Sequence, residues 1–557
     1  METMVNRSVS RRTAIKAGLA GAAGVAAMAR GQELVRAMAA QGAPGGRLVI
    51  GKILDLYTYD PHLSASQVSW EVQAMVYESL VFLGDNFELL PGLAERWEQP
   101  DDRTYVFTLR PGVTFHNGRE MTADDVVFSL ERVRDHPESW WNVKLGYTVD
   151  PDPAVAAADA TAEALGTPVT ANKIGLTFAA TGPNQITATL SEPYAPFLQA
   201  LTATTCSIVP GAEVASGDLD LGTTMVGTGP FKVTEHREDQ SWTLARHDGY
   251  WQSGQPVVGE VVWQVIPDET ARVASLRTGE IQAAMFDNPA MLDVMRSDPN
   301  VTPVEQVTTN YYILFVNANR PELEDPRVRQ AISAGIDRAQ IAQAALFGRG
   351  EASGPIAAGF GELATPLEDV PFYTRDVERA KALLAEAGQG GGLSLPLIVT
   401  PDIPLTVPMA EIVKEQLAEV GIEVEILQRD FATFVNEYNV EGTAHLAISW
   451  WAGYSDPYLI LIDAVSTKSF GPVIGQTDTA IDAQLGRVAR ETDLAARQTA
   501  LQELELAIAN QGSFQPLVTR NNFMAYRNDL LGEIRVANAD GYGLPLWHRV
   551  QEVTPTA

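Results

Sequence analysis

The run from residue 393 to residue 457 constrains the fold most, because three strand-like and two helix-like segments alternate along it. The strand-like runs are 395–400, 422–427 and 444–449, and the helix-like runs are 408–420 and 431–439. A β-α-β-α-β order needs crossover connections, which predict a largely parallel sheet with right-handed crossovers. Similar alternation over the rest of the chain predicts an α/β fold class.

The segment "WWAGYSDP", Trp450 to Pro457, follows the last of these strands. Ligands of open α/β sheets bind beyond the carboxyl ends of strands, so this segment is a candidate site. Adjacent side chains on an extended backbone point to opposite faces. We therefore expect one of Trp450 and Trp451 to enter the core and the other to face a cleft, and alternation alone does not decide which. Two interpretations of Tyr454 and Asp456 stay open: both line the site, or Asp456 caps a helix that Pro457 begins.

A chain of 557 residues is too long for one core, and its length predicts two to four domains. With 45% hydrophobic and 20% charged residues it has the composition of a folded globular protein. Its formal net charge of −30 argues against nucleic acid and anionic membrane surfaces as partners, and it favours a soluble monomer.

The N-terminal 39 residues differ from the rest in charge and hydropathy. "SRRTAIK", Ser10 to Lys16, resembles the twin-arginine export motif, and an uncharged small-residue stretch at 17–29 has the length of a signal-peptide core. Ala37-Met38-Ala39 offers a cleavage site, and Ala27-Met28-Ala29 offers a second. We therefore expect residues 1–39 to be a Tat-type signal peptide read by the Tat export machinery. The alternative is a cytoplasmic chain with an irregular Ala/Gly-rich end.

No other stretch approaches the 18 apolar residues of a membrane span, which predicts a soluble periplasmic protein. Cys206 is the only cysteine, and it lies far from the signal. We therefore expect no lipid-modified N-terminal cysteine and no disulfide within the chain, and we expect Cys206 to be a buried small residue.

Several blocks resemble a known family in the family's order. They are "LPGLAERWEQPDDRTYVFTLRPGVTFHNGREMTADDVVFSLERV" (90–133), "VGTGPFKV" (226–233), "HDGYW" (247–251), "SLRTGEIQAA" (275–284), "DPRVRQAISAGIDRAQI" (325–341) and the "WWAGYSDP" region. The family is that of the family 5 solute-binding proteins, the peptide, nickel and opine receptors of ATP-driven importers. The resemblance implies a bilobed type II periplasmic-binding-protein fold with an extra inserted subdomain.

In domain terms the resemblance implies a first lobe made of 40–67, 210–307 and 519–557, with the subdomain at 68–209 inserted into it. The second lobe would span 308–518. The resemblance also implies that the two lobes close over a small polar organic ligand. The protein would then deliver this ligand to the subunits of an ABC permease in the inner membrane.

Ligand-binding candidates come from three regions of the sequence. Tyr57 and Tyr59 follow the first strand, whose loop faces the cleft in the family, with packing of the rings as the alternative. The resemblance favours Trp450 over Trp451 as a wall of the pocket. Arg520 and Asn521 follow a strand-like run at 515–519, where Arg520 either clamps a carboxylate or forms an ordinary ion pair.

The sequence departs from the peptide binders of this family at Gly453. Those relatives carry an Asp three residues before the acid-proline pair, and it holds the ammonium group of the peptide. A buried ammonium without an opposing charge costs several kcal/mol. Ordinary peptides are therefore disfavoured relative to opines, oligosaccharides or other polar organic molecules.

Other function classes lack their signatures. The chain has no G-x-S-x-G, H-E-x-x-H or Walker motif, and its seven histidines are scattered, so we expect neither an enzyme nor a cofactor or dedicated metal site. Two alternatives stay open. One is a nickel or metal-chelate binder, with His62 and Arg520 as the only donors that can be placed. The other is a ligand-binding adaptor for a membrane chemoreceptor.

Overall fold

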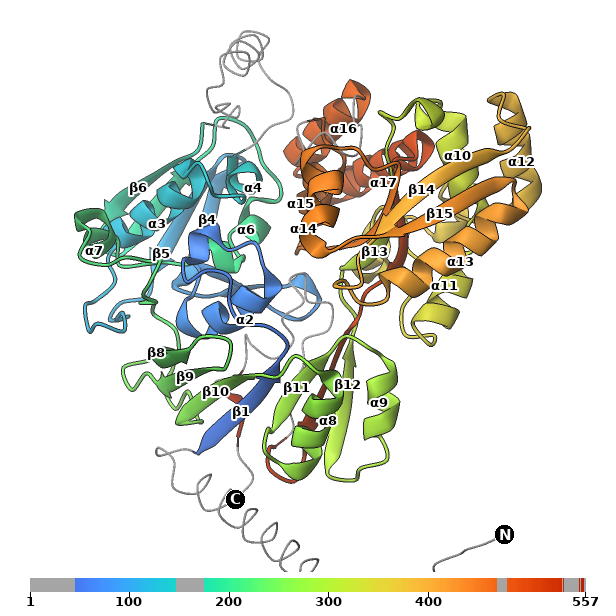
Figure 1. Cartoon of the computed structure of the whole chain (residues 1–557). Helices are drawn as coiled ribbons and strands as arrows, with labels where there is room; N and C mark the ends of the chain where they lie inside the picture. Colours follow the sequence, from blue (N-terminus) through green and yellow to red (C-terminus); the bar gives the residue numbers. More distant parts are fainter. Residues whose placement is uncertain are drawn as a thin grey trace, which may run out of the picture.

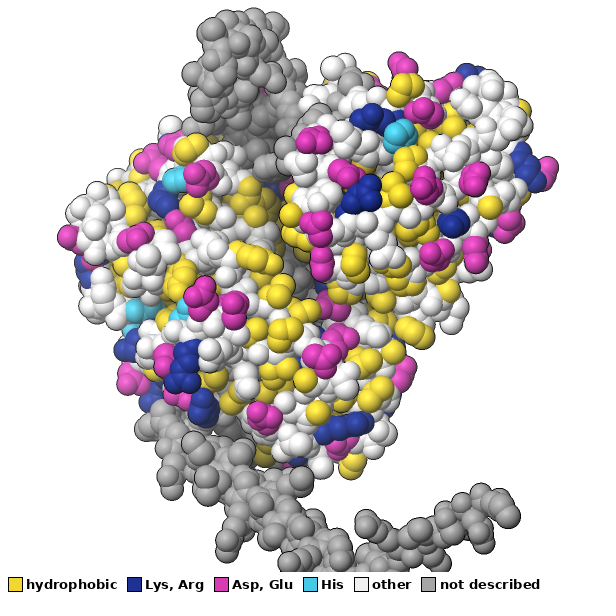
Figure 2. Space-filling view, in the orientation of Figure 1, with side chains coloured by type: hydrophobic (Ala, Val, Ile, Leu, Met, Phe, Trp, Pro, Cys, Tyr) yellow, Lys and Arg dark blue, Asp and Glu magenta, His cyan; other side chains and the backbone are white. Residues whose placement is uncertain are grey.

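The computed structural model describes residues 46–146, 175–467 and 478–532, together with 534, 550 and 552–554. Figure 1 shows two lobes, one in blue and green and one in yellow and orange, and Figure 2 shows a crease between them. On the face shown in Figure 2, acidic and basic side chains are interspersed and no continuous basic area is visible. The predicted signal region 1–39 lies outside the described residues.

A seven-stranded sheet forms the base of the first lobe, in the order β12-β18-β11-β1-β10-β9-β8. Its strands are β1 (Arg47–Lys52), β8 (Phe231–Arg237), β9 (Ser241–Arg246), β10 (Glu260–Val265), β11 (Ala283–Phe286), β12 (Val301–Gln306) and β18 (Asn522–Arg527). β1 pairs parallel with β10 and β11, whereas β18 pairs antiparallel with β11 and β12. Three distant parts of the chain therefore build one sheet.

A five-stranded sheet forms the second lobe, in the order β15-β14-β16-β13-β17. Its strands are β13 (Tyr311–Val316), β14 (Leu393–Val399), β15 (Ile422–Gln428), β16 (Leu446–Trp451) and β17 (Phe514–Thr519). The predicted parallel pairing is confirmed for β14 with β15 and with β16. The sheet is nevertheless mixed, because β13 pairs antiparallel with β16 and β17. Both tryptophans of the "WWAGYSDP" segment belong to β16, which ends two residues later than predicted.

A subdomain lies between β1 and β8 in the sequence. Its antiparallel sheet has the order β4-β5-β7-β6, beside a β2-β3 hairpin. The strands are β2 (Val81–Leu83), β3 (Leu89–Pro91), β4 (Ala94–Asp101), β5 (Thr104–Leu109), β6 (Thr177–Gly182) and β7 (Gln185–Thr189). The helices are α2 (Gln67–Val76), α3 (Ala123–Asp135), α4 (Asn142–Gly146), α6 (Phe197–Ala200) and α7 (Gly211–Ser216). Cys206 is buried in this part of the protein, as predicted.

The remaining helices cover the two large sheets. They are α8 (Glu269–Thr278) and α9 (Ala290–Met295) in the first lobe, and α10 (Pro326–Gly335), α11 (Arg338–Ala345), α12 (Val377–Glu386), α13 (Thr406–Glu419), α14 (Phe431–Val435), α15 (Pro457–Val465), α16 (Thr479–Arg490) and α17 (Leu494–Gln511) in the second. Several helices of the protein begin at a Thr or Asp whose side chain accepts a hydrogen bond from a backbone N–H group of the first turn. These caps include Thr122, Asp268, Asp325, Asp337 and Asp376.

Two short crossing segments, 307–310 and 520–521, connect the seven-stranded sheet to the five-stranded sheet. Hydrogen bonds hold them together: the Thr308 hydroxyl donates to the Arg520 carbonyl at 2.7 Å, and the Arg520 N–H donates to the Asn310 carbonyl at 2.8 Å. Strands of the three larger sheets group along the chain much as the predicted domains do. The domain borders themselves stay a prediction.

Candidate ligand-binding site

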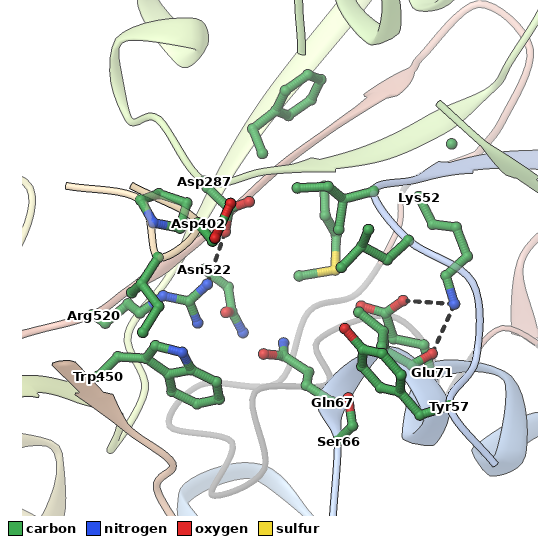
Figure 3. Close-up of a pocket in the computed structure, with 18 of the residues that line it drawn as sticks. Lys52, Tyr57, Ser66, Gln67, Glu71, Asp287, Asp402, Trp450, Arg520 and Asn522 are labelled. Atoms are coloured by element: carbon green, nitrogen blue, oxygen red, sulfur yellow. Dashed lines mark hydrogen bonds and ion pairs between the residues drawn. The ribbon is translucent and has the colours of Figure 1, made fainter. Parts of the chain in front are cut away.

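A cavity of about 360 Å³ lies between the two lobes, beside the crossing segments (Figure 3). Its wall comes from both large sheets and from α2. The lining residues are Gly51, Lys52, Ile53, Leu54, Tyr57, Ala65, Ser66, Gln67, Val68, Glu71, Trp263, Arg272, Met285, Phe286, Asp287, Asp402, Ile403, Pro404, Phe431, Trp450, Arg520, Asn521 and Asn522. The volume suits a small organic molecule.

Four lining side chains stand at the carboxyl ends of strands that the topology directs toward one place. Lys52 ends β1, and Asp287 directly follows β11, which runs parallel to β1. Asp402 follows β14, and Trp450 is near the end of β16, which runs parallel to β14. The cavity therefore lies where open α/β sheets bind ligands.

Lys52 and Glu71 form a buried charged pair on the first-lobe side. The Lys52 ammonium lies 3.6 Å from the Glu71 carboxylate, and it donates to the Val68 carbonyl at 2.7 Å (Figure 3). Burial lowers the pKa of Lys52. Burial also raises the pKa of Glu71 to about 7, although the neighbouring Lys52 opposes this shift. Both side chains line the cavity and have little access to water, so a polar group bound in the cavity would act on their charges.

Arg520 connects both lobes across the cavity wall. Its guanidinium lies 2.8 Å from the Asp287 carboxylate of the first lobe and 5.2 Å from the ring centroid of Trp450 in the second. Figure 3 shows these three side chains together on one side of the cavity. A guanidinium over an aromatic face gains cation–π attraction, so Arg520 holds the Trp450 ring in place.

The mouth of the cavity is apolar on both lobes. Leu54 and Tyr57 contribute from the first lobe and are 44% and 70% exposed. Ile403, Pro404 and Phe431 contribute from the second, where Phe431 is 51% exposed. Apolar side chains that line the cavity from both lobes favour a ligand with an apolar part.

Comparison with known proteins places this geometry in a family. Residues 88–471 match the family model described as bacterial extracellular solute-binding proteins, family 5 middle. The chain belongs to the family 5 solute-binding proteins. The family 5 assignment implies a small ligand and the permease of an ABC importer as partners. Among the described residues, no helix combines the length and apolar character needed to cross a bilayer.

Individual relatives of this family 5 protein differ in what their names say they bind. The dipeptide-binding protein of Escherichia coli is 29% identical over 422 residues, which cover 72% of this chain and 75% of that protein. Heme-binding protein A of Haemophilus influenzae is also 29% identical, covering 82% of this chain and 84% of that protein. The structure of the periplasmic binding protein DppA from Helicobacter pylori, in complex with the peptide STSA, shares the fold. Its TM-score is 0.74 at 22% identity, over 92% of this chain and 99% of that one.

Four of the predicted site residues of the family 5 protein lie together in the cavity: Tyr57, Trp450, Arg520 and Asn521. The Asn521 amide donates to the Glu305 carboxylate at 3.0 Å, so one side of its side chain is already engaged. Arg520 is ion-paired, as the alternative interpretation held, but the pair lies in the cavity wall and not on the outer surface. The contact of these four residues with a ligand stays a prediction.

Tyr59 and Trp451 do not line the cavity. The Tyr59 hydroxyl lies 2.6 Å from His236 Nδ1, and its ring packs 5.1 Å from that of Trp242. Trp451 packs against Phe315 with ring centroids 5.7 Å apart. Both tryptophans are half-buried. Because side chains alternate along β16, Trp450 points toward the cavity and Trp451 points to the opposite face of the sheet, where it packs against Phe315.

Tyr454 and Asp456 also lie outside the cavity, because the chain turns away after β16. Asp456 caps α15, accepting from the Tyr458 N–H at 2.8 Å, and it pairs with both terminal nitrogens of Arg497 at 2.8 and 2.9 Å. Tyr454 is buried against Trp141, with ring centroids 5.3 Å apart. The capping interpretation of Asp456 therefore describes its position, and its prediction as a cavity residue is corrected.

The close packing around Gly453 explains why this family 5 protein has no acidic residue at position 453. Its N–H donates to the Asn310 side-chain oxygen. A Cβ atom at 453 would lie 2.1 Å from the Thr309 hydroxyl and 2.5 Å from the Thr309 carbonyl carbon. The first crossing segment therefore packs directly on Gly453, and any side chain there would have to displace backbone.

The cavity residues that the sequence interpretation missed include Lys52, Glu71, Asp287, Asp402 and Phe431. A usable signal existed for the first four. Three are charged residues at or just beyond the ends of apolar strands, and Glu71 is a charge on the buried face of α2. Phe431 begins a helix at an exposed position, which the hydrophobic pattern does not distinguish from a packing residue.

His62 is not available as a metal donor. Its Nε2 donates to the Ser207 carbonyl at 2.8 Å, its Nδ1 accepts from Arg132 at 2.9 Å, and the residue is fully buried outside the cavity. Arg520 is in the cavity but is paired with Asp287. Within the described ranges, no group of three His, Cys, Asp or Glu side chains is placed to hold a metal ion.

One fully buried and one half-buried histidine predict a loss of stability in acid. His62 and His116 each use Nε2 as a donor to a carbonyl and Nδ1 as an acceptor, which fits only the neutral ring. Burial lowers the pKa of His62 to about 4 and that of His116 to about 3. The folded state therefore binds fewer protons than the unfolded state, whose histidines titrate near pH ~6.5. Stability present above that pH is lost as the pH falls toward 4.

We expect these two histidines together to contribute about 2 kcal/mol of lost stability per pH unit between about pH 6 and pH 4.5. Urea unfolding at several pH values measures the total. NMR titration of the histidine rings assigns the loss to His62 and His116, because the ring signals of these two residues should keep the chemical shifts of the neutral form below pH ~5. Titration of both rings near their ordinary pKa would contradict this explanation.

Proposed function

We propose that this protein captures a polar organic solute in the cavity between its lobes and delivers it to an ABC permease in the inner membrane. The supporting observation is the position of Trp450, stacked on Arg520 in a cavity that both lobes line. We further propose that the twin-arginine sequence directs export by the Tat machinery, and that the mature chain works in the periplasm as a soluble monomer without a lipid anchor. No cofactor is needed, because stacking and lobe closure suffice for capture.

The ligand class follows from the charges of the cavity. Three cations and three acids line it: Lys52, Arg272, Arg520, Glu71, Asp287 and Asp402. Lys52 and Arg520 are paired with Glu71 and Asp287. Asp402 accepts only from the Thr400 hydroxyl at 3.2 Å and the Phe431 N–H at 3.1 Å, with no cation in ion-pair distance among the described residues. A cationic group of a ligand would therefore meet Asp402 at the cavity mouth and not an acid beside Gly453.

The lack of an acid at position 453 favours solutes without the free α-ammonium of a peptide, such as opines, oligosaccharides or N-blocked peptide-like molecules, and Asp402 is left to meet a cationic group in another part of the solute. A thermal-shift panel of matched compounds tests the proposal: dialanine against N-acetyl-dialanine, with agropinic acid, short oligosaccharides and nickel–histidine alongside. We expect stabilisation by members without an α-ammonium group and none by dialanine. Stabilisation by dialanine alone would contradict the proposed ligand class, and stabilisation by nickel–histidine alone would favour a metal-chelate binder.

Replacing Trp450 by Ala is expected to weaken binding of any stabilising panel compound by about ten- to a hundredfold, because an aromatic wall of the cavity is lost. Calorimetric titration measures the change. Trp451→Ala is the matched control, since it removes a neighbouring ring that packs on Phe315. That variant should lose stability but keep its affinity. If Trp450→Ala and the unaltered protein bound the compound with equal affinity, Trp450 would not be part of the binding site.

A further inference from the structure

A buried ion pair joins the inserted subdomain to the second lobe. Lys144 on α4 pairs with Asp463 on α15, and their side chains are only 0% and 5% exposed. Figure 1 shows α4 and α15 facing each other across the crease between the lobes. The two residues are 319 positions apart in the sequence, so the contact depends on how the two parts are placed.

Three aromatic rings surround the Lys144 ammonium. Its nitrogen lies 4.3 Å from the ring centroid of Trp140, 4.7 Å from that of Trp141 and 4.8 Å from that of Tyr454. The Trp141 N–H donates to the Ala200 carbonyl at 3.0 Å, and this bond fixes its ring. Tyr454 comes from the second lobe, so the ring enclosure is complete only when the two parts are in contact. Cation–π attraction then replaces part of the lost hydration of the ammonium.

Further contacts cross the same border. The Ala195 N–H donates to the Ala489 carbonyl at 2.8 Å, and the Ser455 hydroxyl donates to the Gln199 carbonyl at 3.1 Å. The inserted subdomain and the second lobe are therefore in contact through several pairs of groups and not through the Lys144–Asp463 pair alone.

The border is connected to the cavity by five residues of chain. Trp450 lines the cavity, Gly453 is held against the first crossing segment, and Tyr454 reaches the Lys144 enclosure. The Thr309 hydroxyl also donates to the Tyr454 carbonyl at 3.1 Å. Trp450 and Tyr454 are therefore held in fixed positions relative to each other, because the segment between them is bonded to the first crossing segment.

We propose that Lys144, Asp463 and the rings around them form a latch that locks the inserted subdomain onto the second lobe when the cavity is closed. The inference rests on the proposed function, since a latch has a role only if the lobes open and close. Its chemistry makes the lock reversible. A buried charged pair gains its attraction at the cost of desolvation, and opening returns both charges to water. The latch residues act by positioning Trp450 and do not contact the ligand.

Distance measurement between the two parts tests the latch in the full chain. Spin labels at Thr181→Cys in β6 and Ala495→Cys in α17 would occupy exposed positions on the two sides of the border, and the native Cys206 is buried. We expect a short-distance population in the otherwise unaltered protein as purified. Asp463→Asn and Lys144→Met, which each leave one buried partner unpaired, should lower the ratio of short to long distances by about tenfold or more.

Glu503→Gln is the matched control, because it removes a carboxylate from the exposed Arg487–Glu503 pair within the second lobe, and it should leave the ratio unchanged. An unchanged ratio in both latch variants would overturn the latch. If neither variant folds, hydrogen exchange of the unaltered protein decides. If the amides of 142–146 and 457–465 lose protection together, before global unfolding, the result supports the latch. If they exchange only with global unfolding, the result refutes it.

These outcomes are independent of the thermal-shift panel. Panel binding with an unchanged distance ratio would refute the latch and leave the proposed function standing. A shifted ratio without any panel binding would support the latch and count against the proposed ligand class.

Discussion

Replacing Arg497 by Met should lower the free energy of unfolding by about 3–5 kcal/mol. Arg497 is the only cation within ion-pair distance of Asp456 among the described residues, and the two side chains are 10% and 4% exposed. Removing the guanidinium leaves a buried carboxylate without its two charged hydrogen bonds, while the cap on α15 remains. Urea unfolding of the variant measures the loss.

Two comparisons separate this effect from general damage. Arg487→Met removes an exposed partner of Glu503 and should change stability by less than about 1 kcal/mol. Arg497→Met combined with Asp456→Ser removes the buried charge and keeps a helix cap, so it should recover most of the loss. A single Arg497→Met variant as stable as the parent would show that the pair contributes nothing.

Gly453→Asp should fail to create a peptide site and should destabilise the protein by about 3 kcal/mol or more. The reason is steric, because a Cβ atom there would lie within 2.1–2.7 Å of Thr309 and Asn310. Backbone of the first crossing segment cannot yield as the end of a flexible side chain can. Urea unfolding measures the stability, and calorimetric titration with dialanine measures peptide binding.

Gly391→Asp is the control for this variant, since the site is exposed and a Cβ there has no atom within 4 Å. It should be close to neutral. A Gly453→Asp protein that folds with the parent's stability and acquires affinity for dialanine would refute the steric account. It would also show that this cavity differs from a peptide-binding cavity only in the residue at position 453.

Much of the fold could be predicted from the sequence, because local signals agreed with one another. The strand-like runs 395–400, 422–427 and 444–449 correspond to β14, β15 and β16, and the helix-like run 408–420 corresponds to α13. The antiparallel position of β13 in the second sheet could not be predicted. A fully buried strand such as "YYILFV" carries no alternation that would reveal its neighbours.

The site was predictable in part, and for one physical reason. Trp450, Arg520 and Asn521 lie at or just beyond the carboxyl ends of strands, which is the rule that also places Lys52, Asp287 and Asp402. Tyr454 and Asp456 lie only four and six residues beyond Trp450, yet they serve the border with the inserted subdomain and the start of α15. Sequence proximity could not separate these roles, because the turn at Gly453 is set by a distant segment.

Native mass spectrometry of the protein purified from its own host tests the central claim most directly. We predict a noncovalent organic molecule on the unaltered chain, released by unfolding, and a clearly lower occupancy on Trp450→Ala purified in the same way. Equal occupancy on the two proteins would contradict capture against Trp450. One nickel ion per chain in place of an organic molecule would contradict the proposed ligand class.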